Sequence, residues 1–216
     1  MRSAGARVAL ALLVHGLLLA APVVVLGQEA WSQPLLWLWL LGALGLHLVE
    51  RLSSGDHLDE RAEPSLDLRL ALLTGLLLLG IQWAAAGEFL WRGLEPTSAW
   101  IAAGAGLITV GIALRGLAIR TLGSDFVSDV EGRPGGALCQ EGVYAWSRHP
   151  SEVGLLAFAL GFAFLLGSPL ACAAVLFGLA PLVAVRLQRE DRVLEDRFPD
   201  YPAYAARVGW VLPRVR

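Results

Sequence analysis

Long apolar stretches alternate with short charged segments along this chain of 216 residues. The apolar stretches predict helices near Ala6–Leu26, Pro34–Val49, Leu66–Ala86, Ala99–Ile119, Glu152–Leu166 and Pro169–Arg189. A helix that crosses the hydrocarbon core of a bilayer needs about 20 apolar residues, and the second and fifth stretches are shorter than that. The pattern predicts an all-α integral membrane protein with about six (five to six) transmembrane helices.

The connection between the last two predicted helices consists of Gly167 and Ser168 alone. So short a connection allows only a tight turn, so we expect a C-terminal helical hairpin. Pro169 suits the first turn of the second helix, where a missing backbone N–H costs nothing.

Three glycines, Gly104, Gly106 and Gly111, lie within the fourth predicted helix. No strand precedes them, so a dinucleotide-binding loop is not indicated. Small residues inside a membrane span let two helices approach closely, and we interpret these glycines as a packing face.

The distribution of arginine predicts the orientation of the helices. If the N-terminus lies in the cytoplasm, the segments on that side hold 16 of the 17 arginines, and the outer segments hold Arg92 alone. Cytoplasmic loops of membrane proteins carry such an excess. Both termini and the polar loop Leu122–Ser147 are expected on the cytoplasmic side. Val8–Leu26 exceeds the about 7–15 apolar residues of a secretory signal, so it predicts a first span and no cleavage.

Composition supports the membrane assignment and adds little else. Hydrophobic residues make up 56% of the chain and charged residues 17%, and the net charge of −2 gives no indication of nucleic-acid binding. All basic residues are arginine, which suggests GC-rich coding and a bacterial inner membrane. Cys139 and Cys172 have no metal-ligand neighbours in sequence, so neither a metal site nor a reactive thiol is predicted.

Polar residues gather in two segments, Glu141–Pro150 and Arg186–Tyr204. The first segment directly precedes the hairpin and the second lies at its far end. Because the two helices of a hairpin run antiparallel, both segments should lie side by side on the cytoplasmic side of the membrane.

The first segment suits an anionic ligand. Pro150 should begin a helix, which leaves Arg148 and His149 at its N-terminus, where free N–H groups and the helix dipole favour anions. A guanidinium can bind a carboxylate with two parallel hydrogen bonds. Tyr144 and Trp146 offer flat faces for an aromatic ring. The alternative is that these side chains only anchor the helix at the lipid interface.

The second segment suits a cationic group. Arg186 and Glu190 share one helix face, and Asp191 adds a second carboxylate. Together with the first segment, these carboxylates could bind a ligand that carries both ammonium and carboxylate groups. They could also form a solvated interfacial helix. Beyond them, an apolar-aromatic stripe predicts an amphipathic helix on the cytoplasmic membrane surface; it consists of Leu194, Phe198, Tyr201 and Tyr204.

The order and spacing of these residues resemble a known family. The first motif reads Gly142-Val143-Tyr144…Arg148-His149-Pro150-Ser151…Gly154. The second reads Arg186…Glu190-Asp191…Leu194…Phe198-Pro199-Asp200-Tyr201…Tyr204…Val208…Leu212-Pro213. From about Leu138 to Pro213 the chain resembles the isoprenylcysteine carboxyl methyltransferases and their phospholipid methyltransferase relatives.

The resemblance implies a membrane methyltransferase in which S-adenosylmethionine binds at the cytoplasmic surface and a lipid-like acceptor enters from the bilayer. It also implies two parts, N-terminal spans over 1–121 and a methyltransferase core over 122–216. Arg186 and Glu190 are the implied catalytic residues. The implied cofactor-binding residues are Leu138, Gly142, Tyr144, Arg148, His149, Pro150, Glu190 and Asp191.

The chain departs from the family pattern in two places. It reads Gly136-Ala137-Leu138-Cys139 where the family often has His-x-Leu-Val, and it has Glu152 where an aromatic residue commonly follows Arg-His-Pro-x. Glu152 could favour a cationic or amine acceptor, or it could stabilise the start of the helix. The segment Gly132–Gly136 could be a mobile lid or an ordinary turn.

Three functions are consistent with the sequence. The first is methyl transfer to a thiol, an amine or a carboxylate of a lipophilic acceptor. Membrane lipids are expected around the protein, and the sequence leaves its oligomeric state open. The second is an NADPH-dependent membrane reductase of the sterol-reductase type. The third is a non-catalytic scaffold or transporter subunit, although no ionisable residue lies deep in the later predicted spans, where a transport path would be expected.

Overall fold

The computed structural model describes residues 16–17, 32–54, 66–122 and 138–211, and regular structure in this part of the chain is helical. The helices are α2 (Pro34–Ser54), α3 (Leu66–Arg92), α4 (Ser98–Leu122), η4 (Gly142–Ala145), α5 (Pro150–Leu165), α6 (Pro169–Ala174), η5 (Val175–Leu179), α7 (Ala180–Arg197) and α8 (Tyr201–Arg207). The predicted all-α class is confirmed for these residues. The expected first span Ala6–Leu26, apart from two of its residues, and the Gly132–Gly136 segment lie outside the described residues.

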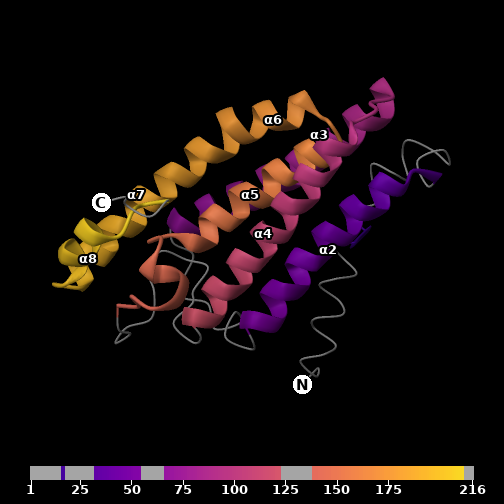
Figure 1. Cartoon of the computed structure of the whole chain (residues 1–216). Helices are drawn as coiled ribbons and strands as arrows, with labels where there is room; N and C mark the ends of the chain where they lie inside the picture. Colours follow the sequence, from indigo (N-terminus) through magenta and orange to yellow (C-terminus); the bar gives the residue numbers. More distant parts are fainter. Residues whose placement is uncertain (1–15, 18–31, 55–65, 123–137, 212–216) are drawn as a thin grey trace, which may run out of the picture.

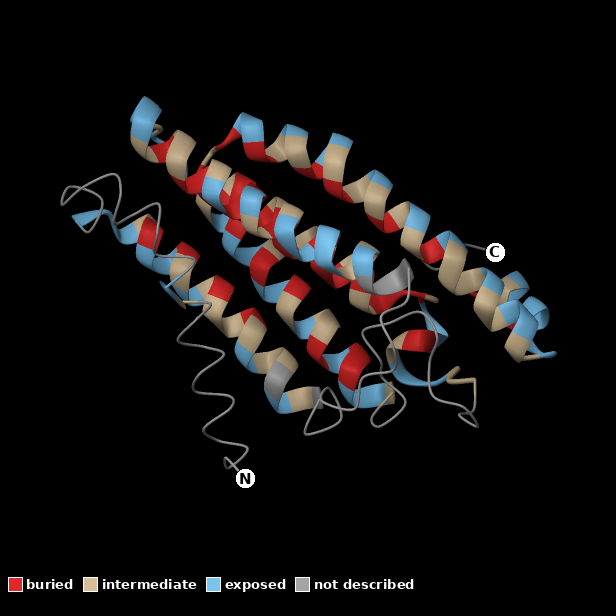
Figure 2. Cartoon of the chain, turned by 180° about the vertical axis from the view of Figure 1, so that it is seen from behind, coloured by how far each residue is buried: buried red, intermediate tan, exposed pale blue. Residues whose placement is uncertain are grey.

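The long helices lie side by side as a bundle of nearly aligned rods (Figure 1). Within the residues that the structure describes, three helices are long and apolar enough to cross a membrane: Arg69–Arg92, Ser98–Leu122 and Pro169–Arg197. Two shorter apolar helices cover Pro34–Glu50 and Pro150–Leu165. Exposed segments alternate with buried ones along the long helices (Figure 2), and many of the exposed side chains are large and apolar, as a lipid environment requires. The number of complete crossings stays a prediction.

The helical hairpin is present as predicted. Gly167 adopts a positive φ of 62°, and the Ser168 side chain accepts a hydrogen bond from the Ala171 N–H at 3.0 Å. Glu88 of α3 accepts two further bonds, from the Ser168 hydroxyl at 2.6 Å and from the Leu170 N–H at 3.0 Å. The turn is thereby fixed to a third helix, and α6, η5 and α7 continue from it in unbroken succession from Pro169.

Close backbone contact joins α4 to α5, the most extensive helix pair in the described residues. A Cβ added to Gly104 would lie 2.3 Å from the Leu165 nitrogen, and one added to Gly111 would lie 2.6 Å from the Gly154 oxygen. Gly161 faces the backbone of α4 in the same way. The predicted packing face is correct for two of its three glycines. It is wrong for Gly106, which has nothing within 4 Å of its added Cβ because it lies on the opposite side of the helix.

Aromatic side chains fill the centre of the bundle beside this contact. Phe158 and Phe162 of α5 pack edge to face with ring centroids 4.6 Å apart, and Trp39 of α2 lies 6.4 Å from Phe162. All three are at most 1% exposed. The rings fix the rotation of α5, and with it the direction of the side chains at its first turn.

The expected amphipathic helix through Leu194, Phe198, Tyr201 and Tyr204 is wrong as one continuous element. Helix α7 ends at Arg197, Phe198 is extended with φ −119° and ψ 107°, and a separate α8 begins at Tyr201. Pro199 is the cause, because a proline disfavours helical geometry in the residue before it. Tyr201 and Tyr204 are 1% and 3% exposed, so they pack inside the protein.

The glycine contact between α4 and α5 gives a stability prediction. Replacing Gly111 by Ala should lower the free energy of unfolding by about 1–3 kcal/mol, because a methyl group has no space against the backbone of α5. Thermal unfolding in detergent measures the change. Gly106→Ala, in the same helix and with open space around it, is the matched control; equal losses in both variants would contradict the proposed contact.

Candidate functional site

The loop before α5 is held in place by the C-terminal end of the described chain. Gly142 begins η4 with a φ of 57°, a conformation that favours glycine, and a Cβ there would come within 3.3 Å of Thr121. The Tyr144 carbonyl accepts a hydrogen bond from the Tyr204 hydroxyl at 2.7 Å. The Arg148 N–H donates to the Gly209 carbonyl at 3.0 Å. The loop and the tail therefore position each other.

The start of α5 directs the side chain of His149 into the protein. Pro150 occupies the first helical turn, and His149 takes the N-cap position with a non-helical backbone. The His149 N–H donates to the Ser147 hydroxyl oxygen at 3.3 Å, and Ser147 in turn donates to the Trp210 carbonyl at 3.3 Å. His149 is only 3% exposed as a result.

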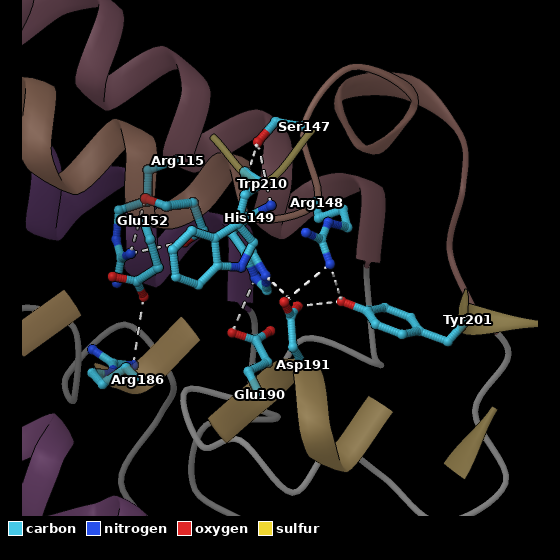
Figure 3. Close-up of polar contacts among 11 residues, drawn as sticks. Arg115, Ser147, Arg148, His149, Glu152, Arg186, Glu190, Asp191, Tyr201 and Trp210 are labelled. Carbon is cyan, nitrogen blue, oxygen red and sulfur yellow. Dashed lines mark hydrogen bonds and ion pairs between the residues drawn. The ribbon is translucent and has the colours of Figure 1, made fainter. Parts of the chain in front are cut away.

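Five residues form what we call the charged cluster: Arg148, His149, Glu190, Asp191 and Tyr201 (Figure 3). Arg148 Nη1 lies 3.0 Å from Asp191 Oδ2, and His149 Nε2 lies 2.8 Å from Asp191 Oδ1. The Tyr201 hydroxyl donates to Asp191 Oδ1 and accepts from Arg148 Nη1 at 3.3 Å. His149 Nδ1 lies 3.3 Å from Glu190 Oε2. The two polar segments thus meet at one site, as the hairpin predicted.

The charges of this cluster set the protonation of its histidine. Burial acts to lower the pKa of His149, but its hydrogen bonds to Asp191 and Glu190 outweigh that effect and raise the pKa to about 9. Burial raises the pKa of the Tyr201 hydroxyl, and its bond to Asp191 raises it further. Both groups are therefore protonated hydrogen-bond donors at neutral pH.

Arg186 lies beside the charged cluster but forms no hydrogen bond or ion pair with its members in the described part of the chain. Its Nη2 is 3.5 Å from Glu152 Oε1, and its Nη1 donates to the Thr74 hydroxyl at 3.4 Å. Arg186 lies four residues before Glu190 on α7, so the two side chains follow each other along the same face of the helix. The implied catalytic pair thus consists of one residue in the cluster and one residue beside it.

The other residues that the resemblance implied have mainly positioning contacts. Leu138 packs against the buried group of Tyr201, Tyr204 and Val208. Gly142 and Tyr144 shape the loop, as described above. Their contact with a cofactor stays a prediction.

Sequence reasoning missed Trp210. Its ring meets the His149 ring edge to face, with centroids 6.4 Å apart. Trp210 follows the last predicted helix and matches no periodic pattern, so its place beside His149 depends entirely on how the tail folds back. Glu152 and Arg186 were both noted in the sequence, but the ion pair between them was not predicted.

Several buried polar atoms of the site have no hydrogen-bond partner among the described residues. They include Arg148 Nε and Trp210 Nε1, which are donors, and Glu152 Oε2, which is an acceptor. Such groups destabilise a fold unless a ligand or water satisfies them. The Glu190 side chain is 38% exposed and carries a carboxylate at the open side of the cluster. Donors for an anion and a carboxylate for a cation are thus both present, which fits the ammonium and carboxylate groups of S-adenosylmethionine.

Comparison with known proteins agrees with the motifs. Residues 104–196 match the model of the Isoprenylcysteine carboxyl methyltransferase (ICMT) family. A Protein-S-isoprenylcysteine O-methyltransferase of Saccharomyces cerevisiae is 33% identical over 110 residues, which are 50% of this chain and 46% of that protein. One of Rattus norvegicus is 30% identical over 129 residues, which are 58% of this chain and 45% of that protein. The matches span about half the length of these curated relatives.

Among solved structures, the chain is similar to the eukaryotic intramembrane Ras methyltransferase ICMT at 21% identity and a TM-score of 0.44, covering 81% of this chain and 75% of that chain. The family resemblance predicted from the two motifs is confirmed by the sequence matches. Residues 104–196 are similar to the isoprenylcysteine carboxyl methyltransferase family.

The raised pKa of His149 predicts a pH-dependent stability. Its folded pKa of about 9 exceeds the usual 6.5, so its contribution is fully present below pH 6.5 and is lost as the pH rises through about 9. The melting temperature of the wild-type chain in detergent should therefore fall across this window relative to that of His149→Gln. A difference between the two proteins that stays constant with pH would contradict a protonated His149.

Proposed function

We propose that this chain is a membrane methyltransferase that uses S-adenosylmethionine and methylates a carboxyl group on a lipophilic acceptor. The observation that carries the proposal is the charged cluster, in which Arg148 and His149 of one motif meet Glu190 and Asp191 of the other. These motifs belong to the stretch that resembles the isoprenylcysteine carboxyl methyltransferases, and Glu190 and Asp191 lie within the matched residues.

The unsatisfied donors beside the charged cluster and the Glu190 carboxylate support this cofactor. The buried Arg148 Nε and Trp210 Nε1 would hold its carboxylate, because charge-assisted hydrogen bonds to a guanidinium are strong. Glu190 would bind its ammonium group. When bound, the cofactor supplies an electrophilic methyl group on a sulfonium centre.

The protonation of His149 supports a carboxylate as the acceptor. A thiol or an amine must lose a proton to a base before or during methylation, and His149 with a pKa of about 9 is protonated at neutral pH. A carboxyl group with an ordinary pKa of about 3.5 is already ionised there. The chain would then need only to bind, align and dehydrate the two reactants, which is where most of the acceleration would come from.

The relatives' names supply the acceptor class. Both are named as O-methyltransferases of protein-S-isoprenylcysteine, so we propose an S-prenylated cysteine carboxylate. The apolar helices around the site suit entry of the prenyl chain from the bilayer. From the distribution of arginine we place the site on the cytoplasmic side, and from the use of arginine for all basic residues we place the chain in a bacterial inner membrane.

Loss of the Arg148 side chain should weaken cofactor binding. We expect Arg148→Met to raise the Kd for S-adenosylmethionine at least about tenfold, because it removes a charge-assisted contact to the carboxylate. Calorimetry on the detergent-purified chain measures the Kd. Arg192→Met, at an exposed position of the same helix as Glu190, is the control and should leave it unchanged. Preferential binding of NADPH would favour the reductase instead.

The methylated group can be identified directly. Incubation of the wild-type chain with methyl-labelled S-adenosylmethionine and a total lipid extract should give a labelled lipid that releases labelled methanol in mild base, as a methyl ester does. Label that resists base would indicate a thioether or an amine and would contradict the carboxyl acceptor. Heat-denatured protein provides the blank.

A further inference from the structure

A second charged pair lies next to the charged cluster. Glu152 projects from the first turn of α5 and Arg186 projects from α7 (Figure 3). Glu152 Oε1 lies 3.5 Å from Arg186 Nη2. Glu152 is 8% exposed, and its second oxygen, Oε2, is buried and has no hydrogen-bond partner among the described residues. A buried carboxylate oxygen in such a position strongly favours an incoming donor.

The pair is close to the place where a methyl group would be transferred. Glu152 follows His149 by three residues, and Arg186 precedes Glu190 by four. At a rise of about 1.5 Å per helical residue, each member lies roughly 4.5–6 Å along its helix from a residue of the charged cluster. A small polar group could therefore contact the pair while its neighbour reaches a donor held by the cluster.

Other charges near the pair leave its balance unchanged. Arg115 lies beside Glu152 in Figure 3, but its Nε is paired with Glu50 of α2 and its Nη1 donates to the Ser151 hydroxyl at 2.8 Å. The charges of Arg115 and Glu50 therefore cancel, as do those of Arg186 and Glu152. An acceptor carboxylate that binds Arg186 would draw it away from Glu152 and leave the buried Glu152 side chain without a partner.

We propose that Glu152 and Arg186 select an acceptor that is a zwitterion, namely an S-prenylcysteine with a free α-ammonium group. Arg186 binds the acceptor carboxylate, and Glu152 Oε2 accepts a hydrogen bond from the ammonium group. The ammonium group gives Glu152 a partner while Arg186 binds the carboxylate, whereas an N-acylated cysteine carries only the carboxylate and competes with Glu152 for Arg186. This inference rests on the proposed function and names the substrate class of the same site.

The binding of two matched compounds tests the inference. S-farnesylcysteine and N-acetyl-S-farnesylcysteine share the prenyl chain and the carboxylate but differ in the ammonium group. Calorimetry on the detergent-purified chain should give a Kd at least about tenfold lower for the free amine, as a charge-assisted hydrogen bond would produce.

Glu152→Gln separates selection from a merely structural role. The amide keeps the shape and an oxygen for Arg186 but removes the charge, so the free amine should bind more weakly and the N-acetyl compound more tightly. A structural defect would weaken both. Glu195→Gln, at an exposed position on α7, is the control and should retain wild-type selectivity.

The outcomes distinguish this inference from the proposed function. Equal affinities in the wild-type chain, or equal weakening of both compounds in Glu152→Gln, would overturn the selection of a zwitterion. Formation of labelled methyl ester from the bound compound is measured in parallel. Selective binding of the free amine without any ester would support recognition by Glu152 and Arg186 and count against the methyltransferase assignment. Equal affinity for both compounds, with ester formed from each, would support the methyltransferase assignment and overturn the selection of a zwitterion.

Discussion

The carboxylate of Asp191 is the interaction on which the site depends. It accepts hydrogen bonds from Arg148 and His149, which directly precede α5, and from Tyr201, which begins α8. Asp191 is half-buried, and a carboxylate removed in part from water is stabilised by such donors, each of which is itself stabilised by the negative charge. The helical hairpin brings α7 back beside the loop that precedes α5, and Asp191 then fixes the loop, the helix and the tail relative to one another.

The rigidity of this arrangement comes from the membrane part of the bundle. Lipid provides no hydrophobic force between helices, so α4 and α5 associate through close backbone contact at Gly104, Gly111, Gly154 and Gly161. The same contact fixes the rotation of α5. Because His149 and Glu152 lie at the start of that helix, packing deep in the bundle determines the direction of both site residues. The positive charge of His149 follows from those neighbours, and so does its unsuitability as a base at neutral pH.

Predictions from the sequence failed where a local pattern does not define which part of the protein a side chain packs against. The stripe through Leu194 and Tyr204 has helical spacing, but Pro199 divides it, and its tyrosines pack against Leu138 and Val208 instead of lipid. Gly106 has the same local sequence character as Gly104 but faces away from α5. Trp210 gave no periodic signal, because its contact with His149 arises only when the tail folds over the loop.

The sequence by itself determined the helical class, the hairpin at Gly167-Ser168 and the proximity of the Arg148 and Glu190 segments. Those features follow from apolar length, turn length and connectivity, which are all local properties. The tertiary structure decided that Asp191 is the central acceptor, that Arg186 pairs with Glu152, and that Trp210 lies beside His149. The physical reason is that helical periodicity defines which residues share a face, whereas the rotation of each helix against its neighbours, set by packing, defines which side chains that face meets.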